Sequence, residues 1–193
     1  MVKIPKILAF AGSTRQDSFN KKLVKIAAAG AKAAGAEVTV IDLRDYPMPL
    51  YDGDLETAQG LPENVRKFKD ILRAHDGWLI SAPEYNSSIT GVLKNSIDWA
   101  SRALPGEPPF ACFNGKAVVL MSASPGGLGG LRGLVHLRAI LGNMNVLVLP
   151  GQVAVSRAQE AFDAGGALKD PKQQAAIEKL GTDLVRILEK IIS

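Results

Sequence analysis

Short apolar runs alternate along the chain with longer segments in which apolar residues recur at helical spacing. Continuous apolar runs of about four to eight residues are typical of buried strands, whereas a three-to-four spacing is typical of amphipathic helices. The predicted strands cover residues 7–11, 38–41, 77–81, 116–122 and 146–149. The predicted helices cover residues 18–34, 62–75, 89–102, 129–142 and 174–191.

Strands that alternate with helices predict an α/β fold with a parallel sheet and helices on both of its faces. Right-handed crossovers restrict the topology to a few doubly wound strand orders. Two segments fall outside the alternation. Residues 47–60 are punctuated by proline and glycine and are predicted to form a loop, and residues 152–170 are predicted to be a surface insertion because they show the least regular pattern.

Composition adds few constraints but excludes several classes of protein. Hydrophobic residues make up 47% of the 193-residue chain and charged residues 22%, which suits one globular domain over residues 1–193. Cys112 is the single cysteine, so no disulfide can form within the chain. The net charge of +4 is scattered and not clustered with aromatic residues, so we expect no nucleic-acid binding. No apolar run approaches the ~20 residues that span a bilayer, and we expect a cytoplasmic protein without membrane association.

The loop after the first predicted strand gathers hydroxyl, amide and guanidinium groups at the start of a helix. Helix N-termini attract anions through their free N–H groups and their dipole, so this loop predicts a phosphate site. The alternative is that Asp17 or Ser18 only caps the helix. The cofactor-binding residues predicted here are Ser13, Thr14, Arg15, Ser18, Phe19 and Asn20.

Two missing motifs reduce the classes of phosphate ligand that this loop could bind. The loop has neither the GxxxxGK[ST] pattern of nucleotide triphosphate sites nor the GxGxxG pattern of dinucleotide sites. A glycine-poor loop rich in hydroxyls favours a mononucleotide phosphate that side chains enclose. Asp42 ends the second predicted strand, and we interpret it as a capping residue in preference to a ribose ligand.

Two further loops follow predicted strands and supply groups that suit a planar ring. Ligands of open α/β sheets bind beyond the carboxyl ends of the strands, where these loops begin. A tyrosine face and neighbouring polar groups in the loop after the third strand suit a heterocycle with N–H and C=O edges. Tyr85, Asn86 and Ser87 supply these groups, and the glycine-rich loop at residues 122–130 would form a flexible wall around the same ligand. The alternative for both loops is a simple turn without a ligand.

Three ordered motifs in these segments are similar to signatures of a known family. They are GSTRQDSFN at residues 12–20, PEYN at residues 83–86 and GVLKNSIDW at residues 91–99. At these positions the chain resembles the NADPH-dependent FMN reductases, specifically the flavodoxin-like chromate and quinone reductase group. The resemblance implies a flavodoxin-like three-layer sandwich whose five-stranded parallel sheet has the order 2-1-3-4-5. It also implies that the ring of a bound flavin would contact Pro83, Glu84, Tyr85, Asn86 and Ser87 on one side and Ser124 and Gly126 on the other.

The resemblance also implies an activity. FMN would be the cofactor and NADPH or NADH the electron donor, with hydride chemistry at flavin N5, no catalytic side chain and no metal. The acceptor would be a quinone, chromate or another metal oxyanion, an azo compound or free flavin. Arg102 is a possible contact for NAD(P)H or the acceptor. The helix through Lys94, Asp98 and Trp99 would contribute to a homodimer or homotetramer.

Two other functions remain open from the sequence. One is a flavodoxin-type electron carrier that does not itself oxidise NAD(P)H, although such carriers are usually strongly acidic and this chain is net positive. The other is a Rossmann nucleotide-binding protein without flavin.

Overall fold

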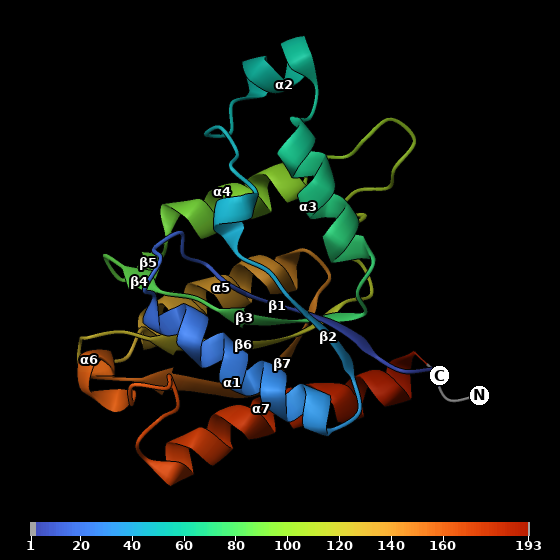
Figure 1. Cartoon of the computed structure of the whole chain (residues 1–193). Coiled ribbons are helices and arrows are strands. Elements are labelled where there is room, and N and C mark those ends of the chain that lie inside the picture. Colours follow the sequence, from blue (N-terminus) through green and yellow to red (C-terminus); the bar gives the residue numbers. More distant parts are fainter. Residues whose placement is uncertain (1–2, 193) are drawn as a thin grey trace.

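A five-stranded parallel sheet forms the centre of the computed structural model, which describes residues 3–192 (Figure 1). The strands are β1 (Lys6–Ala11), β2 (Glu37–Val40), β3 (Gly77–Ser81), β6 (Ala117–Ala123) and β7 (Leu147–Val155). Their order is β2-β1-β3-β6-β7. Since β4 (Glu84–Tyr85) and β5 (Ser88–Ile89) form a separate hairpin, this order is the predicted 2-1-3-4-5.

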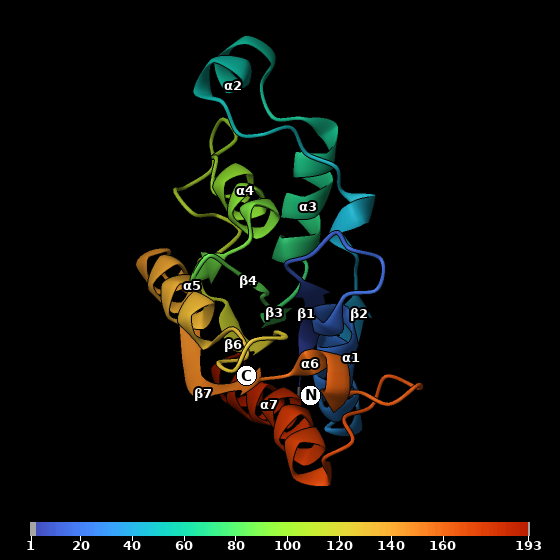
Figure 2. The same cartoon turned by 90° about the vertical axis from the view of Figure 1, so that its left-hand side faces the viewer.

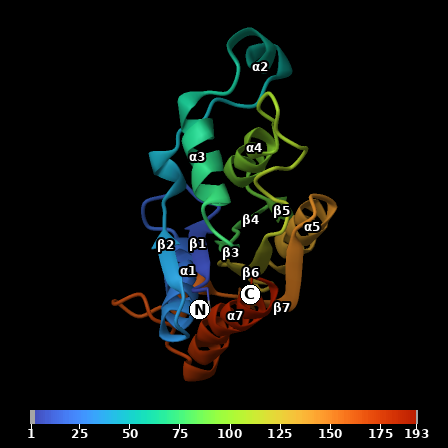
Figure 3. The same ribbon diagram turned by 90° about the vertical axis from the view of Figure 1, so that its right-hand side faces the viewer.

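Helices cover both faces of the sheet, which confirms the predicted sandwich (Figures 1 and 3). One layer consists of α1 (Phe19–Ala33) and α7 (Pro171–Ile191), and the other of α3 (Glu63–Arg73), α4 (Gly91–Ala100) and α5 (Leu131–Asn143). Successive side chains of a strand point to opposite faces. In β1, Ile7 and Ala9 therefore join the core under α1 and α7, while Leu8 and Phe10 join the core on the other face.

The last strand is longer than the apolar run that predicted it. β7 continues to Val155, which pairs with Ala123, after a register irregularity in its pairing with β6 between Val118 and Leu120. The apolar run stops before Pro150, but an edge strand tolerates proline because one row of its N–H groups faces solvent. The predicted surface insertion at residues 152–170 was therefore wrong for residues 152–155, which belong to the sheet. The rest includes the short helix α6 (Ala158–Ala161) and lies mostly at the surface, although Ala158 is fully buried.

The segment predicted as a loop at residues 47–60 contains a helix that buries none of its residues, α2 (Gly53–Gln59). Asp52 caps it by accepting a hydrogen bond of 2.8 Å from the backbone N–H of Asp54. A short 3-10 helix, η1 (Leu43–Asp45), precedes it. α2 stands apart from the sheet, above α3 and α4 (Figures 1 and 2). Leu55 is its single large apolar residue and packs against the cluster of Leu61, Val65 and Trp99. One such residue makes no apolar stripe, so periodicity could not detect the helix.

Two glycines allow α1 and α7 to approach closely. A Cβ atom at Gly181 would lie 2.1 Å from the carbonyl oxygen of Ala27, and one at Gly30 would lie 2.1 Å from the carbonyl oxygen of Glu178. Both contacts are to backbone, which cannot move aside as a flexible side chain would. The two helices therefore cross at a distance that only glycine permits.

Gly181→Ala is expected to lower the free energy of unfolding by about 3 kcal/mol, because it forces the two helix backbones apart. Urea unfolding followed by circular dichroism measures the change. Gly142→Ala is the matched control, since Gly142 also lies in a helix but a Cβ atom there would meet nothing within 4 Å. This control should be neutral or gain about 0.5–1 kcal/mol. Equal effects at the two positions would argue against the close crossing.

Two negative findings apply to residues 3–192. None of the helices there combines the length and apolar composition required to cross a bilayer. The same residues contain no group of three or more histidine, cysteine, aspartate or glutamate side chains placed to hold a metal ion.

Candidate functional site

The three loops predicted to carry the chemistry meet at one pocket beyond the carboxyl ends of β1, β3 and β6. The pocket has a volume of about 50 Å³, which exceeds the ~10–15 Å³ that a cavity needs to hold one water molecule. Its lining residues are Ser13, Arg15, Ser18, Phe19, Asn20, Pro83, Glu84, Tyr85, Ala123, Ser124 and Pro125. Of the predicted residues in the three loops, Thr14, Asn86, Ser87 and Gly126 do not line it.

Two polar groups of the first loop are available to a ligand. Ser18 occupies the N-cap position of α1 and is 5% exposed, yet its side chain makes no capping hydrogen bond. The interpretation that Ser18 only caps the helix therefore fails. The exposed Arg15 side chain has no hydrogen bond or ion pair within the part of the chain that the structure describes. A hydroxyl, a guanidinium and the N-terminus of α1 thus converge on the pocket, a donor set that suits a phosphate group.

Other residues of this loop have local partners. Asp17 is paired with Lys22, with 2.9 Å between Oδ1 and Nζ, and does not cap α1. The hydroxyl of Ser13 accepts a hydrogen bond of 3.2 Å from the backbone N–H of Arg15, which fixes the turn. Since that hydroxyl keeps its own proton, Ser13 can still donate to an anion.

Asn20 ties the loop to two strands, a role that the sequence did not indicate. Its side chain is 3% exposed, and Nδ2 donates to the carbonyl oxygen of Ala123 at 2.8 Å. Oδ1 accepts from the hydroxyl of Ser81 at 2.8 Å and from the backbone N–H of Ala123 at 3.0 Å. Asn20 therefore fixes the start of α1 against the ends of β3 and β6, and one amide N–H remains for a ligand.

Thr90 is a further positioning residue that the sequence analysis missed. Its buried hydroxyl donates to the carbonyl oxygen of Gly12 at 2.7 Å and caps α4 by accepting from the backbone N–H of Leu93 at 3.2 Å. A Cβ atom at Gly12 would lie 2.8 Å from Cδ2 of Leu93, so the chain needs glycine there. A threonine just before a helical pattern is a capping signal that could have located this residue.

The second loop is the β4–β5 hairpin. Asn86 and Ser87 form its two-residue turn with φ angles of 52° and 66°, as a type I′ turn requires. The Glu84 carboxylate accepts from the backbone N–H of Gly133 at 3.1 Å and forms an ion pair of 3.0 Å with Arg132. The hairpin is thereby attached to α5. Tyr85 is 56% exposed at the edge of the pocket.

The third loop approaches other backbone too closely for side chains. Gly129 and Gly130 have φ angles of 63° and 93°. A Cβ atom at Gly129 would lie 2.7 Å from the backbone carbonyl carbon of Val155, and one at Gly130 would meet the hydroxyl of Ser122. Ser124 accepts a hydrogen bond of 3.3 Å from the N–H of Gly126 through its hydroxyl, so the two predicted residues form one compact turn.

The segment after β7 supports the pocket from behind. The rings of Phe19 and Phe162 are stacked, with 5.9 Å between centroids and 7° between planes. Phe19 lines the pocket and Phe162 is 8% exposed. The segment that looked like an insertion therefore helps to hold a residue of the site.

The remaining predicted residues lie on α4 or just after its end. The guanidinium of Arg102 stacks over the ring of Tyr51 at 5.3 Å, at the end of the helix opposite Thr90. Trp99 is fully buried and donates to the carbonyl oxygen of Pro49 at 2.8 Å, so it packs within the chain and cannot form an interface with another copy. Lys94 and Asp98 are bound to each other at 2.8 Å.

Comparisons with known proteins agree with this geometry. The family model of NADPH-dependent FMN reductases matches residues 5–160. The chain belongs to the NADPH-dependent FMN reductase family. An NAD(P)H-dependent FMN reductase of Pseudomonas aeruginosa is 39% identical, with 90% of each chain covered. A quinone reductase of Escherichia coli K12 is 38% identical, with 75% of this chain and 73% of the relative covered.

Solved structures show the same fold. A flavoenzyme NAD(P)H:(acceptor) oxidoreductase of Paracoccus denitrificans has a TM-score of 0.81 at 28% identity, covering 97% of this chain and 99% of that one. An archaeal flavodoxin has a TM-score of 0.60 at 11% identity, covering 95% and 98%; this likeness concerns the fold alone. Membership of the FMN reductase family makes the protein an oxidoreductase with FMN as cofactor and NAD(P)H as donor. It argues against both the pure electron carrier and the flavin-free alternative.

Proposed function

We propose that residues 1–193 form one FMN-binding domain that oxidises NADPH or NADH and reduces a small-molecule acceptor. The pocket where the three loops meet supports this proposal, because the side chains of Arg15 and Ser18 reach it and have no hydrogen-bond partner in residues 3–192. Bound FMN supplies the redox chemistry, so the protein contributes binding, orientation and electrostatics.

The residues divide into two proposed groups. Phosphate contacts come from the loop before α1, namely Ser13, Thr14, Arg15, Ser18, Phe19 and Asn20. Ring contacts come from Pro83, Glu84, Tyr85, Asn86 and Ser87 on one side and from Ser124 and Gly126 on the other. The backbone N–H groups of the β4–β5 turn would stabilise negative charge on the ring. Arg102 is proposed to contact NAD(P)H or the acceptor. This contact requires that the bound molecule extends along α4 to the end opposite Thr90.

We propose a quinone as the acceptor. The exposed face of Tyr85 at the edge of the pocket offers a flat apolar surface for an aromatic ring, and the Escherichia coli relative is named a quinone reductase. Chromate, azo compounds and free flavin are the acceptors to compare with it. Purified protein should show flavin absorption that bleaches with NADPH under anaerobic conditions and recovers when quinone is added. A protein that binds no FMN in titration would refute the proposal.

Assembly and location complete the proposal. Leu128, Leu131 and Val135 are 51%, 41% and 57% exposed at the start of α5, close to the β4–β5 hairpin. Exposed apolar side chains gathered on one surface favour self-association, so we propose a homodimer or homotetramer, which analytical ultracentrifugation would detect.

We also propose that the protein is cytoplasmic, because its single, buried cysteine suits a reducing compartment.

Arg15→Ala is expected to weaken FMN binding by roughly 10- to 100-fold, because a charge-assisted hydrogen bond to phosphate contributes about 1.5–3 kcal/mol. Quenching of flavin fluorescence at moderate salt measures the dissociation constant. Arg44→Ala is the control, since Arg44 is also exposed and does not line the pocket. Wild-type FMN affinity in Arg15→Ala would contradict the phosphate assignment.

A further inference from the structure

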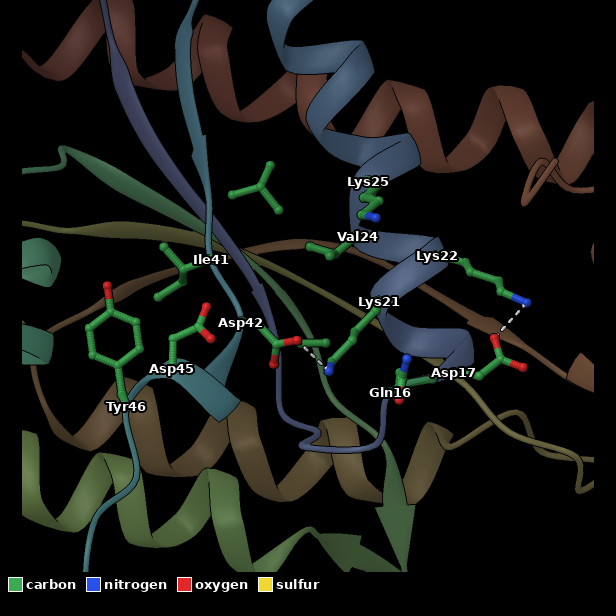
Figure 4. Close-up of a pocket in the computed structure, with 13 residues that line it drawn as sticks. Gln16, Asp17, Lys21, Lys22, Val24, Lys25, Ile41, Asp42, Asp45 and Tyr46 are labelled. Atoms are coloured by element: carbon green, nitrogen blue, oxygen red, sulfur yellow. Dashed lines mark hydrogen bonds and ion pairs between the residues drawn. The ribbon is translucent and has the colours of Figure 1, made fainter. Parts of the chain in front are cut away.

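A second and much larger cavity adjoins the phosphate pocket. Its volume is about 470 Å³, which lies within the ~300–1,000 Å³ of typical small-molecule sites. It lies between α1 and residues 41–46 (Figure 4). Ser18 lines both cavities, and Gln16 and Asp17 lie between Ser18 and the phosphate-pocket residue Arg15 in the sequence. A ligand that begins at the phosphate pocket can therefore continue into this cavity.

One wall of the cavity is apolar. Val24 of α1, Val40 of β2 and Ile41 line it, beside the ring of Tyr46. Val40 is 40% exposed because β2 is the edge strand and no helix covers its end. A planar apolar group that lies on these side chains would remove them from water, which is favourable.

The other wall is charged but carries no net charge, since three lysines face three aspartates. Two pairs neutralise each other, Lys21 with Asp42 at 2.6 Å and Lys22 with Asp17 at 2.9 Å (Figure 4). Within residues 3–192, Lys25 and Asp45 have no ion-pair partner. The cavity thus offers one free cation and one free anion beside an apolar surface, a combination that a simple inorganic anion would not use.

Asp42 follows the end of β2 and lines the cavity. It caps η1, as expected from the sequence, by accepting from the backbone N–H of Arg44 at 3.0 Å. Burial opposes ionisation, but the hydrogen bond from Lys21 and that from Arg44 lower the pKa of Asp42, so it is a carboxylate at neutral pH. In doubly wound sheets an acid about 20 residues after the phosphate loop accepts from the ribose hydroxyl of a dinucleotide.

We propose that this cavity binds the adenosine moiety of an adenine dinucleotide. The purine would lie on Val40 and Ile41, the ribose hydroxyls would donate to Asp42 or Asp45, and Lys25 would contact a phosphate. Two dinucleotides carry this chemistry, namely the NAD(P)H donor and FAD in place of FMN. The first source rests on the proposed function, whereas adenosine binding itself is tested without turnover.

The direct test titrates FMN-loaded protein with AMP and with adenosine 2′,5′-bisphosphate by calorimetry. Val40→Trp fills the apolar wall, and Lys25→Glu reverses the free cation. Val40→Trp should weaken binding at least about tenfold because the indole occupies the space of the purine, and Lys25→Glu should do the same because an anion replaces the cation that would contact the phosphate. Lys32→Glu is the matched control, because Lys32 is an exposed lysine two turns further along α1 and does not line the cavity. It should bind as wild type does.

Two measurements distinguish NAD(P)H from FAD as the dinucleotide that occupies the cavity. If the donor occupies the cavity, Val40→Trp should raise KM about tenfold for NADPH and leave KM unchanged for reduced nicotinamide mononucleotide, which lacks adenosine. If the flavin occupies it, Val40→Trp should weaken FAD about tenfold and leave FMN affinity unchanged. Either result supports the proposal, and Lys25→Glu repeats both comparisons at an exposed helical position if Val40→Trp does not fold.

The proposal is overturned if wild-type protein binds neither AMP nor adenosine 2′,5′-bisphosphate at millimolar concentration, or if the cavity variants bind them as tightly as Lys32→Glu does. Its failure is distinct from failure of the proposed function. A protein that binds AMP through Val40 but binds no flavin would keep the adenosine site and lose the FMN reductase assignment, whereas loss of AMP binding alone would leave that assignment intact.

Discussion

Glu107→Ala is expected to lower the free energy of unfolding by about 3–5 kcal/mol, because it leaves a buried lysine without its counter-charge. The Lys69 side chain is 1% exposed, and its Nζ lies 3.0 Å from Oε2 of Glu107. The carboxylate also pairs with Arg73 and accepts from the backbone N–H of Leu104 at 2.9 Å. Without it, the ammonium keeps one partner in residues 3–192, the carbonyl oxygen of Arg102.

Two further variants test whether the unpaired lysine is the cause. Glu107→Gln keeps a hydrogen-bond acceptor and removes the charge, so its loss of stability should be smaller. Adding Lys69→Met to Glu107→Ala replaces the ammonium with an apolar side chain of similar length, and most of the lost stability should return. Urea unfolding measures all three free energies. A double variant that is no more stable than Glu107→Ala would attribute the loss to the contacts of Glu107 with Arg73 and Leu104.

Acid should remove the same stabilisation from the unchanged protein. Burial opposes ionisation of Glu107, but hydrogen bonds from Leu104 and Lys69 together with the charges of Lys69 and Arg73 lower its pKa below the ordinary value of 4.5. A carboxyl whose pKa is depressed by folding stabilises the protein fully above its unfolded-state pKa. That stabilisation is lost as the pH falls through the folded-state pKa. Below pH 4.5 the stability of wild type should therefore decline more steeply with pH than that of Glu107→Ala.

The sheet and the position of the site could be predicted because each rests on a local pattern. Buried parallel strands give continuous apolar runs, and the doubly wound arrangement brings their carboxyl ends together. Residues 12–20, 83–87 and 122–130 were therefore expected at one edge of the sheet, and the strand order implied by the family resemblance makes them neighbours. The part of β7 after Leu149 was not predicted because Pro150 and Gly151 interrupt the apolar run. Both residues are tolerated because β7 is an edge strand of the sheet.

Pairings between distant residues could not be predicted. Lys69 lies in a helical segment where lysine normally faces solvent, and its partner Glu107 is 38 residues away in an irregular loop. The contacts of Asn20 are 61 and 103 residues away. A polar residue in a phosphate loop is naturally interpreted as a ligand, whereas the same amide can hold the strands that shape the pocket. The position of Asn20 in the phosphate loop marked it as part of the site. Only the fold shows whether it binds the ligand or holds the strands together.

Asn20→Ala is expected to lower the free energy of unfolding of the apoprotein by about 2–4 kcal/mol, because several buried polar groups lose their partner and each unsatisfied group costs about 1–3 kcal/mol. The groups affected are the hydroxyl of Ser81 and the backbone N–H and C=O of Ala123. FMN affinity should fall as well, since the start of α1 is no longer fixed against β3 and β6. Urea unfolding without flavin and fluorescence titration with FMN measure the two effects.

The contrast with Arg15→Ala decides which role Asn20 has. The Arg15 side chain is exposed and has no partner in residues 3–192, so its loss should weaken FMN binding and leave the stability of the apoprotein unchanged. Ser81→Ala removes one of the three groups bound to Asn20 and should cost a fraction of the stability lost in Asn20→Ala. If Asn20→Ala instead weakened FMN binding while the apoprotein unfolded as wild type does, Asn20 would be a direct ligand of the cofactor. A loss of both would show that the pocket is shaped before the flavin arrives.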